Sequence, residues 1–237
     1  MKNVLLLDSG SGGVNILNQC VQIATHCNFL MFCDDKNLPY GNKAKDELLA
    51  ITFKNLEMIK SFFTFDIVIF ACNTLTSVCI DQCRKRYRDV IFIGTEPAIK
   101  PALEHFCEKD VLVLATENTL KNNKLIKSHK ELVLFNMPTL ASEIDKNMDN
   151  LHVLKNYLIE NLSNFDAKAI VLGCTHYFAI KDLLLQVFPG VDVFDSARGV
   201  ANRLLSFVEG DKEEFQVQIM TSGDFDFIGR LWWFYNH

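Results

Sequence analysis

Two stretches decide the fold: Ile67-Val-Ile-Phe-Ala-Cys-Asn-Thr74 and its echo Ala169-Ile-Val-Leu-Gly-Cys-Thr-His176. In each, an apolar run of strand length ends in a cysteine within a polar cluster. A second pair repeats the arrangement, with Val4-Leu-Leu-Leu-Asp-Ser-Gly10 echoed by Val111-Leu-Val-Leu-Ala-Thr-Glu117. The echoes predict two related α/β halves that face each other. Because open α/β sheets bind ligands at the carboxyl ends of their strands, the polar clusters also predict a ligand site.

The rest of the chain alternates short apolar runs with longer amphipathic ones. The apolar runs are rich in Val, Ile, Leu and Phe without strict alternation, as in strands buried on both faces. One apolar stripe at three- and four-residue spacing predicts a helix over residues 45–63. This alternation predicts an α/β fold with mainly parallel sheets and right-handed crossovers. The predicted strands are 3–7, 29–33, 67–71, 90–94, 111–115, 132–135, 169–172 and 191–194.

Length and composition exclude several classes of protein. The chain has 237 residues, of which 49% are apolar and 22% charged, so it is neither disordered, collagen-like nor coiled-coil. The net charge of −5 gives no sign of the basic surface that binds nucleic acid, so we expect no nucleic-acid partner. No apolar run approaches the roughly 18 residues of a membrane helix, and residues 4–7 are too short for a signal peptide. We therefore expect a cytoplasmic protein with no membrane partner, whose eight cysteines are reduced.

The loop Asp8-Ser-Gly-Ser-Gly-Gly13 follows the first predicted strand and opens a helix. Its backbone N–H groups are suited to an anion. However, its glycines miss the G-x-G-x-x-G spacing, and no Gly-Lys-Ser/Thr follows. Asp8 would also repel a phosphate. A carboxylate with a nearby cation, such as the ammonium group of an amino acid, fits Asp8 better.

Cys72 and Cys174 are the candidate reactive groups. Each lies at a strand-to-helix turn, where backbone donors and the helix dipole favour the thiolate. Two thiols facing one pocket can remove a proton from one side of a carbon and return it on the other. The remaining cysteines are predicted to be small core hydrophobes: Cys20, Cys27, Cys33, Cys79, Cys83 and Cys107.

A zinc site is the competing use of these residues. The spacings Cys79-x3-Cys83 and Cys174-x-His176 are present, but neither belongs to a paired C-x2-C set. We therefore predict no metal site. His176 is either a structural histidine with its hydrogen bonds satisfied within the protein or a group that adjusts the reactivity of a thiol. Its place two residues after Cys174 favours the second interpretation.

Six segments in sequence order, spanning nearly the whole chain, carry a resemblance to a known family. They are Asp8-Ser-Gly-Ser-Gly-Gly13, Leu38-Pro-Tyr-Gly41, Cys72-Asn-Thr74, Glu96-Pro-Ala-Ile-Lys-Pro-Ala102, Gly173-Cys-Thr-His-Tyr177 and Thr221-Ser-Gly-Asp224. Together they resemble the glutamate racemases of the cofactor-independent aspartate/glutamate racemase superfamily.

The resemblance implies two pseudo-symmetric α/β domains with the active site between them. We expect residues 1–95 plus 208–237 to form the first domain and residues 96–207 the second. The implied activity interconverts L- and D-glutamate without a cofactor or metal, and supplies D-glutamate for peptidoglycan. The implied partner is this small-molecule substrate. A homodimer is a further possibility that the sequence does not decide.

The family's functional residues carry over by motif. Cys72 would act on D-glutamate and Cys174 on L-glutamate, and Asp8 and His176 would assist the two thiols. Hydroxyls, Asn side chains and backbone N–H groups suit a dianionic ligand because they are neutral donors. The implied substrate-binding residues are Asp8, Ser9, Pro39, Tyr40, Gly41, Cys72, Asn73, Thr74, Thr116, Thr119, Cys174, Thr175 and His176.

Three positions depart from the family pattern. Ala115 precedes Thr116 where Gly is usual, and Phe178 follows the Cys-Thr-His-Tyr run where Pro is usual. Asp145 stands where many members carry Glu, with Glu143 two residues earlier. The role of that carboxylate is therefore open.

Two alternative functions remain. One is a sister racemase that acts on aspartate or another amino acid, although Cys-Thr-His at Cys174 favours glutamate over the aspartate branch, which usually has Cys-Thr-Glu. The other is a protein-binding homologue whose catalysis is lost or secondary. The intact set of Cys72, Cys174, Asp8 and His176 argues against it.

Overall fold

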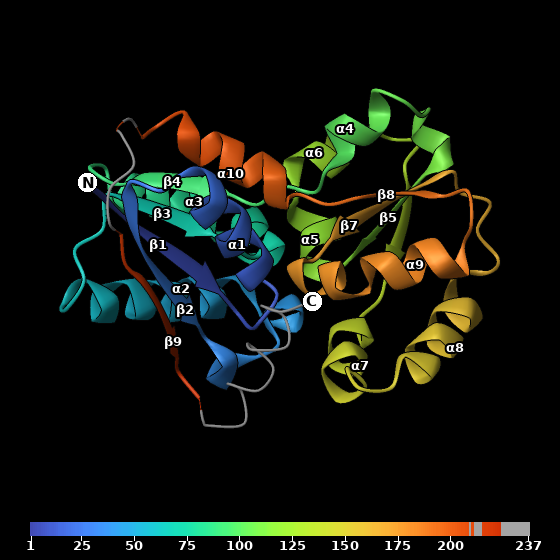
Figure 1. Ribbon diagram of the computed structural model, residues 1–237, viewed down its shortest axis with the longest axis horizontal. Coiled ribbons are helices and arrows are strands. Elements are labelled where there is room, and N and C mark those ends of the chain that lie inside the picture. The colour runs from blue at the N-terminus through green and yellow to red at the C-terminus, as the bar shows by residue number, and fades with distance from the viewer. Residues whose placement is uncertain (209, 211–214, 224–237) are drawn as a thin grey trace.

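The computed structural model describes residues 1–208, 210 and 215–223. The last residue of the motif that begins at Thr221, Asp224, lies outside the described residues. Within them the strands form two sheets, and every strand pairing is parallel. Figure 1 shows the two sheets side by side, each with its own helices. The predicted α/β class with parallel sheets is confirmed.

The first sheet has the strand order β4-β3-β1-β2-β9. Its strands are β1 (Lys2–Asp8), β2 (Cys27–Cys33), β3 (Ile67–Phe70), β4 (Ile91–Gly94) and β9 (Val217–Thr221). Helices α1 (Val14–Ile23), α2 (Lys45–Lys60), α3 (Asn73–Arg86) and α10 (Ala197–Leu205) surround it, with short 3-10 turns η1 (Asp35–Asn37) and η2 (Tyr40–Asn42) between β2 and α2. We call this part of the molecule the first lobe.

The second sheet has the order β6-β5-β7-β8. Its strands are β5 (Val111–Ala115), β6 (Val133–Asn136), β7 (Ala169–Gly173) and β8 (Asp192–Phe194). Its helices are α4 (Ile99–Leu103), α5 (Glu117–Asn122), α6 (Lys124–Ser128), α7 (Leu140–Lys146), α8 (Leu151–Leu162) and α9 (Lys181–Val187), with the 3-10 turns η3 (Glu108–Asp110) and η4 (Thr175–Ile180). We call this the second lobe.

The strand orders explain the sequence echoes. The order β4-β3-β1-β2 becomes β8-β7-β5-β6 when each strand is replaced by the one four places later along the chain. The echoed strands β1 and β5, and β3 and β7, therefore occupy equivalent positions in the two sheets. The predicted pseudo-symmetry is confirmed, and β9 is an addition at one edge of the first sheet.

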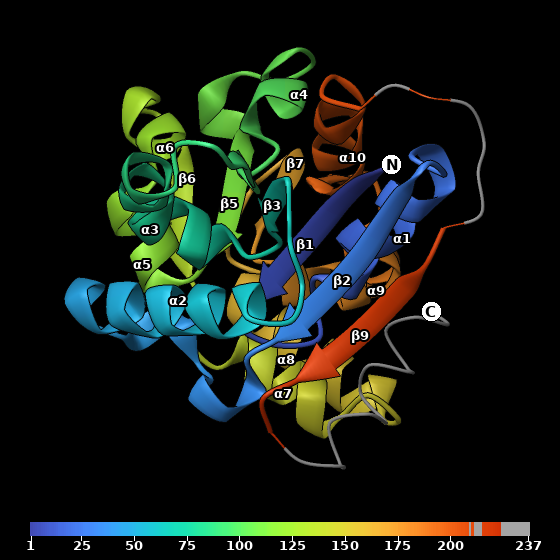
Figure 2. The same cartoon turned by 90° about the vertical axis from the view of Figure 1, so that its left-hand side faces the viewer.

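Burial on both faces accounts for the unbroken apolar runs. Val4 and Leu6 of β1 belong to the apolar cluster that includes residues of α1 and α10, whereas Leu5 and Leu7 pack in the cluster with residues of α2 and α3. Since successive side chains of a strand point to opposite faces, a strand covered by helices on both sides has no polar positions. Figure 2 shows α2 on one side of the first sheet and α1 on the other.

One apolar cluster runs through both lobes. It joins residues of α1 and α10, such as Leu17 and Val200, to residues of β7 and α9, such as Leu172 and Leu184. The lobes thus share a continuous apolar core. Since fully burying one such side chain stabilises the fold by about 1.5–3 kcal/mol, this core holds the two sheets in a fixed relation.

Helix α10 packs against α1 and β4 of the first lobe (Figure 1). The chain therefore returns to the first lobe before Ala197, and we propose a domain boundary near residue 196 in place of the predicted 207. No helix in the described part of the chain is long and apolar enough to cross a membrane.

The structure corrects three local predictions. Strand β9 was not predicted, because Val217, Gln218, Ile219 and Met220 are all exposed and give no burial pattern. Helix α2 ends at Lys60, three residues before the predicted end. Cys107 is exposed, so its assignment to the core was wrong, whereas the other cysteines predicted to be core residues are buried.

The backbones of the two lobes come close together at Gly12. A Cβ atom on Gly12 would lie 2.4 Å from the backbone nitrogen of His176 and 2.5 Å from the carbonyl carbon of Thr175. Both are backbone atoms, which cannot swing away as a flexible side chain can.

We predict that Gly12→Ala lowers the free energy of unfolding by about 1–3 kcal/mol, as overpacking does, because the new methyl group pushes the lobes apart. Gly199→Ala is the matched control. It lies within α10, and apart from the neighbouring residues and backbone of that helix no atom lies within 4 Å of its Cβ position, so the substitution should raise stability by up to about 1 kcal/mol. Urea unfolding measures both, and equal stability of the two variants would contradict the close contact.

Candidate active site

The site is built at equivalent points of the two sheets. In the first lobe β2 lies on one side of β1 and β3 lies on the other. The direction in which the chain adds strands to the sheet therefore reverses between β1 and β3. A crevice forms at such a point outside the carboxyl ends of the strands. Asp8 ends β1 and Cys72 closely follows β3, while Thr116 and Cys174 follow β5 and β7. The Gly12 contact brings the two crevices together.

Asp8 fixes the loop that follows β1. Its carboxylate is fully buried and accepts hydrogen bonds from the backbone N–H of Ser9 at 2.7 Å and of Gly13 at 2.6 Å. Two of the loop's donors are therefore already used by the protein's own carboxylate. This arrangement supports the inference that the loop does not bind a phosphate.

Burial raises the pKa of Asp8 to about 6 from an ordinary 3.8. The charge of nearby His176, the two backbone hydrogen bonds and the thiol of Cys72 act in the opposite direction but do not cancel the cost of burial. A carboxyl group with this pKa can exchange a proton near neutral pH, which an ordinary aspartate does not.

The two candidate thiols differ in exposure, since Cys72 is buried and Cys174 is half-buried. Cys72 is the N-cap of α3 and is 6% exposed, with its Sγ atom 3.9 Å from the hydroxyl of Ser9. Burial raises its pKa well above the usual range, and charge on Asp8 and Cys174 raises it further. Cys174 is the N-cap of η4, and burial raises its pKa to about 12.

These shifts correct the expectation that the turns favour the thiolates. The backbone N–H of Leu75 at Cys72, and those of His176 and Tyr177 at Cys174, do lower the pKa of each thiol. Burial is the larger effect at both. The sequence could not show which of the two effects is larger. A turn motif reveals the backbone donors, but it does not reveal how deeply the thiol is buried.

His176 connects the lobes. It is 3% exposed, and its Nε2 atom lies 3.4 Å from the Ser11 hydroxyl of the first lobe and 3.8 Å from the Asp145 carboxylate of α7. The second carboxylate oxygen of Asp145 is buried and has no hydrogen-bond partner among the described residues. Glu143 instead accepts hydrogen bonds from Lys146 and Asn147 on its own helix and the residue that follows. Asp145, rather than Glu143, therefore faces the site.

Three threonine hydroxyls meet across the lobes. The Thr74 hydroxyl of α3 lies 2.9 Å from that of Thr116 and 3.4 Å from that of Thr119, and the last two lie 3.0 Å apart. We call these residues the threonine cluster. The unusual Ala115 beside it is accommodated by Gly173 of β7, where an added Cβ would lie 2.6 Å from the Cβ of Ala115.

Asn73 and Thr175 complete the polar lining that the motifs predicted. The Asn73 amide donates to the carbonyl of Thr95 at 3.0 Å, which leaves its Oδ1 atom buried without a partner in the described part of the chain. Thr175 is buried in η4. The Oδ1 atom of Asn73 is thus a buried acceptor next to Cys72 that no described residue uses.

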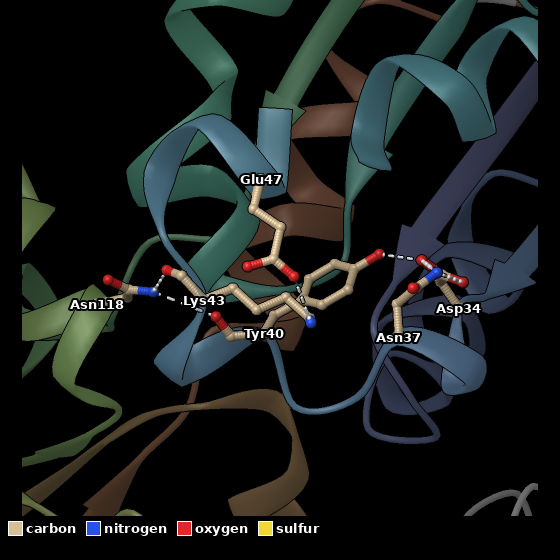
Figure 3. Close-up of polar contacts among 6 residues, drawn as sticks. All are labelled: Asp34, Asn37, Tyr40, Lys43, Glu47 and Asn118. Carbon is tan, nitrogen blue, oxygen red and sulfur yellow. Dashed lines mark hydrogen bonds and ion pairs between the residues drawn. The ribbon is translucent and has the colours of Figure 1, made fainter. Parts of the chain in front are cut away.

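The segment 39–41 lies at the edge of this lining. Tyr40 is buried, and its hydroxyl donates to Asp34 at 2.5 Å (Figure 3). Gly41 is buried against Thr116, but Pro39 is exposed. Pro39 is therefore the predicted binding residue least enclosed by the protein.

Sequence reasoning missed Ser11 and Asp34. Asp34 is fully buried directly after β2 and accepts hydrogen bonds from Asn37, Tyr40, Asn55 and Ser222. Its position at a strand end, like that of Asp8, was the signal that could have found it. Among the described residues, no cluster of three His, Cys, Asp or Glu side chains is arranged to hold a metal ion.

Comparison with known proteins identifies the family. No family model matches the chain. A glutamate racemase of Clostridium novyi is 36% identical to it over 207 residues, which cover 83% of this chain and 80% of that protein. The chain belongs to the glutamate racemase family.

Solved structures of the family share the fold. A glutamate racemase isoform from Bacillus anthracis superposes with a TM-score of 0.85 at 20% identity, covering 98% of this chain and 93% of that one. The glutamate racemase of Francisella tularensis, solved in complex with D-glutamate, gives a TM-score of 0.82 at 20% identity over 100% of this chain and 94% of that one. The glutamate racemase fold therefore extends over nearly the whole chain.

The raised pKa of Asp8 predicts a pH-dependent stability. Because the folded state holds the proton more tightly than the unfolded chain, the stabilisation from this proton is full below pH 4 and is lost as the pH rises through about 6. Asp8→Asn removes this titration. The free energy of unfolding of the variant relative to the parent should increase by about 2 kcal/mol between pH 4 and pH 7.

Urea unfolding of both proteins at the two pH values measures this difference. A relative stability that stays constant with pH would show that Asp8 titrates normally in the folded protein.

Proposed function

We propose that the protein interconverts L- and D-glutamate by two-thiol proton transfer, in which one of Cys72 and Cys174 removes the α-proton and the other delivers its own proton to the opposite face. One observation carries the proposal. The two thiols follow equivalent strands of two pseudo-symmetric sheets, whose loops meet at the Gly12 contact. This placement supports one thiol on each side of a substrate bound between the lobes.

The chemistry needs one thiolate and one thiol. The thiolate takes the α-proton, and the opposite thiol protonates the resulting carbanion on the other face, which inverts the α-carbon. Burial opposes ionisation of both thiols in the free enzyme, but the ammonium group of a bound amino acid favours the thiolate form. In this proposal Asp8 takes up the proton of Cys72, and His176 serves Cys174 in the same way.

The polar lining suits an amino acid with two carboxylates. The unpartnered Oδ1 of Asn73 and the carboxylate of Asp8 are acceptors for the ammonium group. The threonine cluster, Thr175, Ser9 and the backbone at Gly41 supply neutral donors for the carboxylates. Hydrogen bonds from neutral donors hold a charged ligand and stabilise the developing carbanion without neutralising the thiolate.

Glutamate is the substrate that the family relation favours. The relative from Francisella tularensis was solved with D-glutamate bound. We propose the same substrate here, with D-glutamate supplied to peptidoglycan synthesis. A racemase of aspartate or another amino acid is the alternative that a substrate screen must exclude.

We predict that Cys72→Ser and Cys174→Ser each abolish racemisation in both directions, because serine is a far weaker base than cysteine near neutral pH. Each variant keeps one thiol and should still deprotonate one enantiomer of a glutamate analogue that loses a leaving group after deprotonation. Cys174→Ser should act on the D form and Cys72→Ser on the L form, measured by release of the leaving group.

Cys79→Ser and Cys83→Ser are the matched controls. Both residues are buried cysteines of α3, the helix that Cys72 caps, and both variants should racemise glutamate. If both active-site variants acted on the same enantiomer, the assignment of one thiol to each face would be wrong.

We also predict a strong preference for glutamate over aspartate. The shorter side chain would leave buried donors of the site unpaired, at a cost of about 1–3 kcal/mol each. Uptake of α-deuterium from D2O, followed for each amino acid separately, gives kcat/KM for both. Similar values for the two would favour the broader racemase.

A further inference from the structure

A side chain of the second lobe holds a turn of the first lobe at two points. Asn118 lies in α5, two residues after Thr116, and is half-buried. Its Nδ2 atom donates to the carbonyl of Tyr40 at 3.2 Å and to the carbonyl of Lys43 at 2.9 Å (Figure 3). One amide group therefore binds both ends of residues 40–43, the turn η2 with the residue that follows it.

The first lobe holds the same turn from the other side. The Tyr40 hydroxyl donates to Asp34, which is fully buried and also accepts two hydrogen bonds from Asn37 (Figure 3). The first lobe thus fixes the ring of Tyr40, while its backbone is fixed by Asn118 of the second lobe. The orientation of the turn depends on both lobes being together.

Gly41 lies between these two anchors. A Cβ atom on Gly41 would be 3.0 Å from the Cβ of Thr116, a member of the threonine cluster. The Gly41 backbone therefore abuts the second lobe at a residue assigned to substrate binding. A shift of the turn by a few tenths of an ångström would change the spacing between the Gly41 backbone and the threonine hydroxyls.

We propose that Asn118 is a positioning residue that latches residues 40–43 to the second lobe and so sets the binding geometry for the substrate. This inference rests on the proposed function, because it assigns Gly41 and Thr116 to the substrate. The amide is required as a donor, since both of its partners are carbonyl oxygens. A carboxylate of the same shape cannot donate and would repel them.

The test compares Asn118→Ala and Asn118→Asp with Asn122→Ala. Asn122 lies one turn further along α5 and is also half-buried. In the described part of the chain its amide donates to the carbonyl of Asn118, within the same helix, and to no group of the first lobe. It controls for the loss of an asparagine amide from this helix.

For both Asn118 variants we expect KM for L-glutamate to rise about tenfold, with little change in kcat. A tenfold change corresponds to the net contribution of about one hydrogen bond. Hydrogen–deuterium exchange without substrate should become faster at residues 40–43. The melting temperature should match that of Asn122→Ala, whose KM and exchange should match the parent.

If hydrogen–deuterium exchange at residues 40–43 were unchanged in the Asn118 variants, Asn118 would not hold this turn, whether or not the protein racemises glutamate. A fall in kcat at unchanged KM, or the same rise in KM in Asn122→Ala, would overturn the positioning role. If the parent protein did not exchange the α-proton of glutamate, the proposed function would fail instead, and the exchange measurement would still decide whether the latch exists.

Discussion

The site depends on a backbone contact between the two lobes at Gly12. The loop after β1 lies so close to the Thr175–His176 backbone that a single methyl group does not fit between them. This contact brings the carboxyl ends of β1 and β3 against those of β5 and β7. Without it, Asp8 and Cys72 would form one half-site and Cys174 and His176 another. The shared apolar core behind α1, α10 and α9 holds the contact in place.

The close contact of the two lobes excludes water from the site, and the pKa values of its ionisable groups are raised as a result. Burial raises the pKa of Asp8, Cys72 and Cys174 together. Each would be easier to ionise in water, but a solvated thiolate would not be held against one face of a carbon atom. In the proposed reaction, the ammonium group of a bound amino acid favours the thiolate form that burial opposes in the free site. Enclosure and reactivity are therefore linked through the ligand.

The sequence predicted the repeated parts of the molecule and missed those made by long-range contact. Strands β1, β3, β5 and β7 end in polar clusters that recur, so Asp8, Cys72, Cys174 and His176 could be found from pattern and family resemblance. Strand β9 is an edge strand with exposed side chains, and no periodicity marks it. Asp34 and Asn118 are single polar residues whose partners become evident only after folding. The direction of the thiol pKa shifts depends on depth of burial, which a turn motif does not encode.

The central claim is that two thiols act from opposite faces of one carbon atom, and isotope partition tests it most directly. L-glutamate is incubated with the protein in D2O, and both enantiomers are recovered after a small fraction has reacted. The account predicts that the D-glutamate formed carries deuterium at the α-carbon while the remaining L-glutamate keeps its proton, because the removed proton and the delivered deuteron reside on different thiols. D-glutamate that retains the original proton would show that one group transfers it, and would contradict the account.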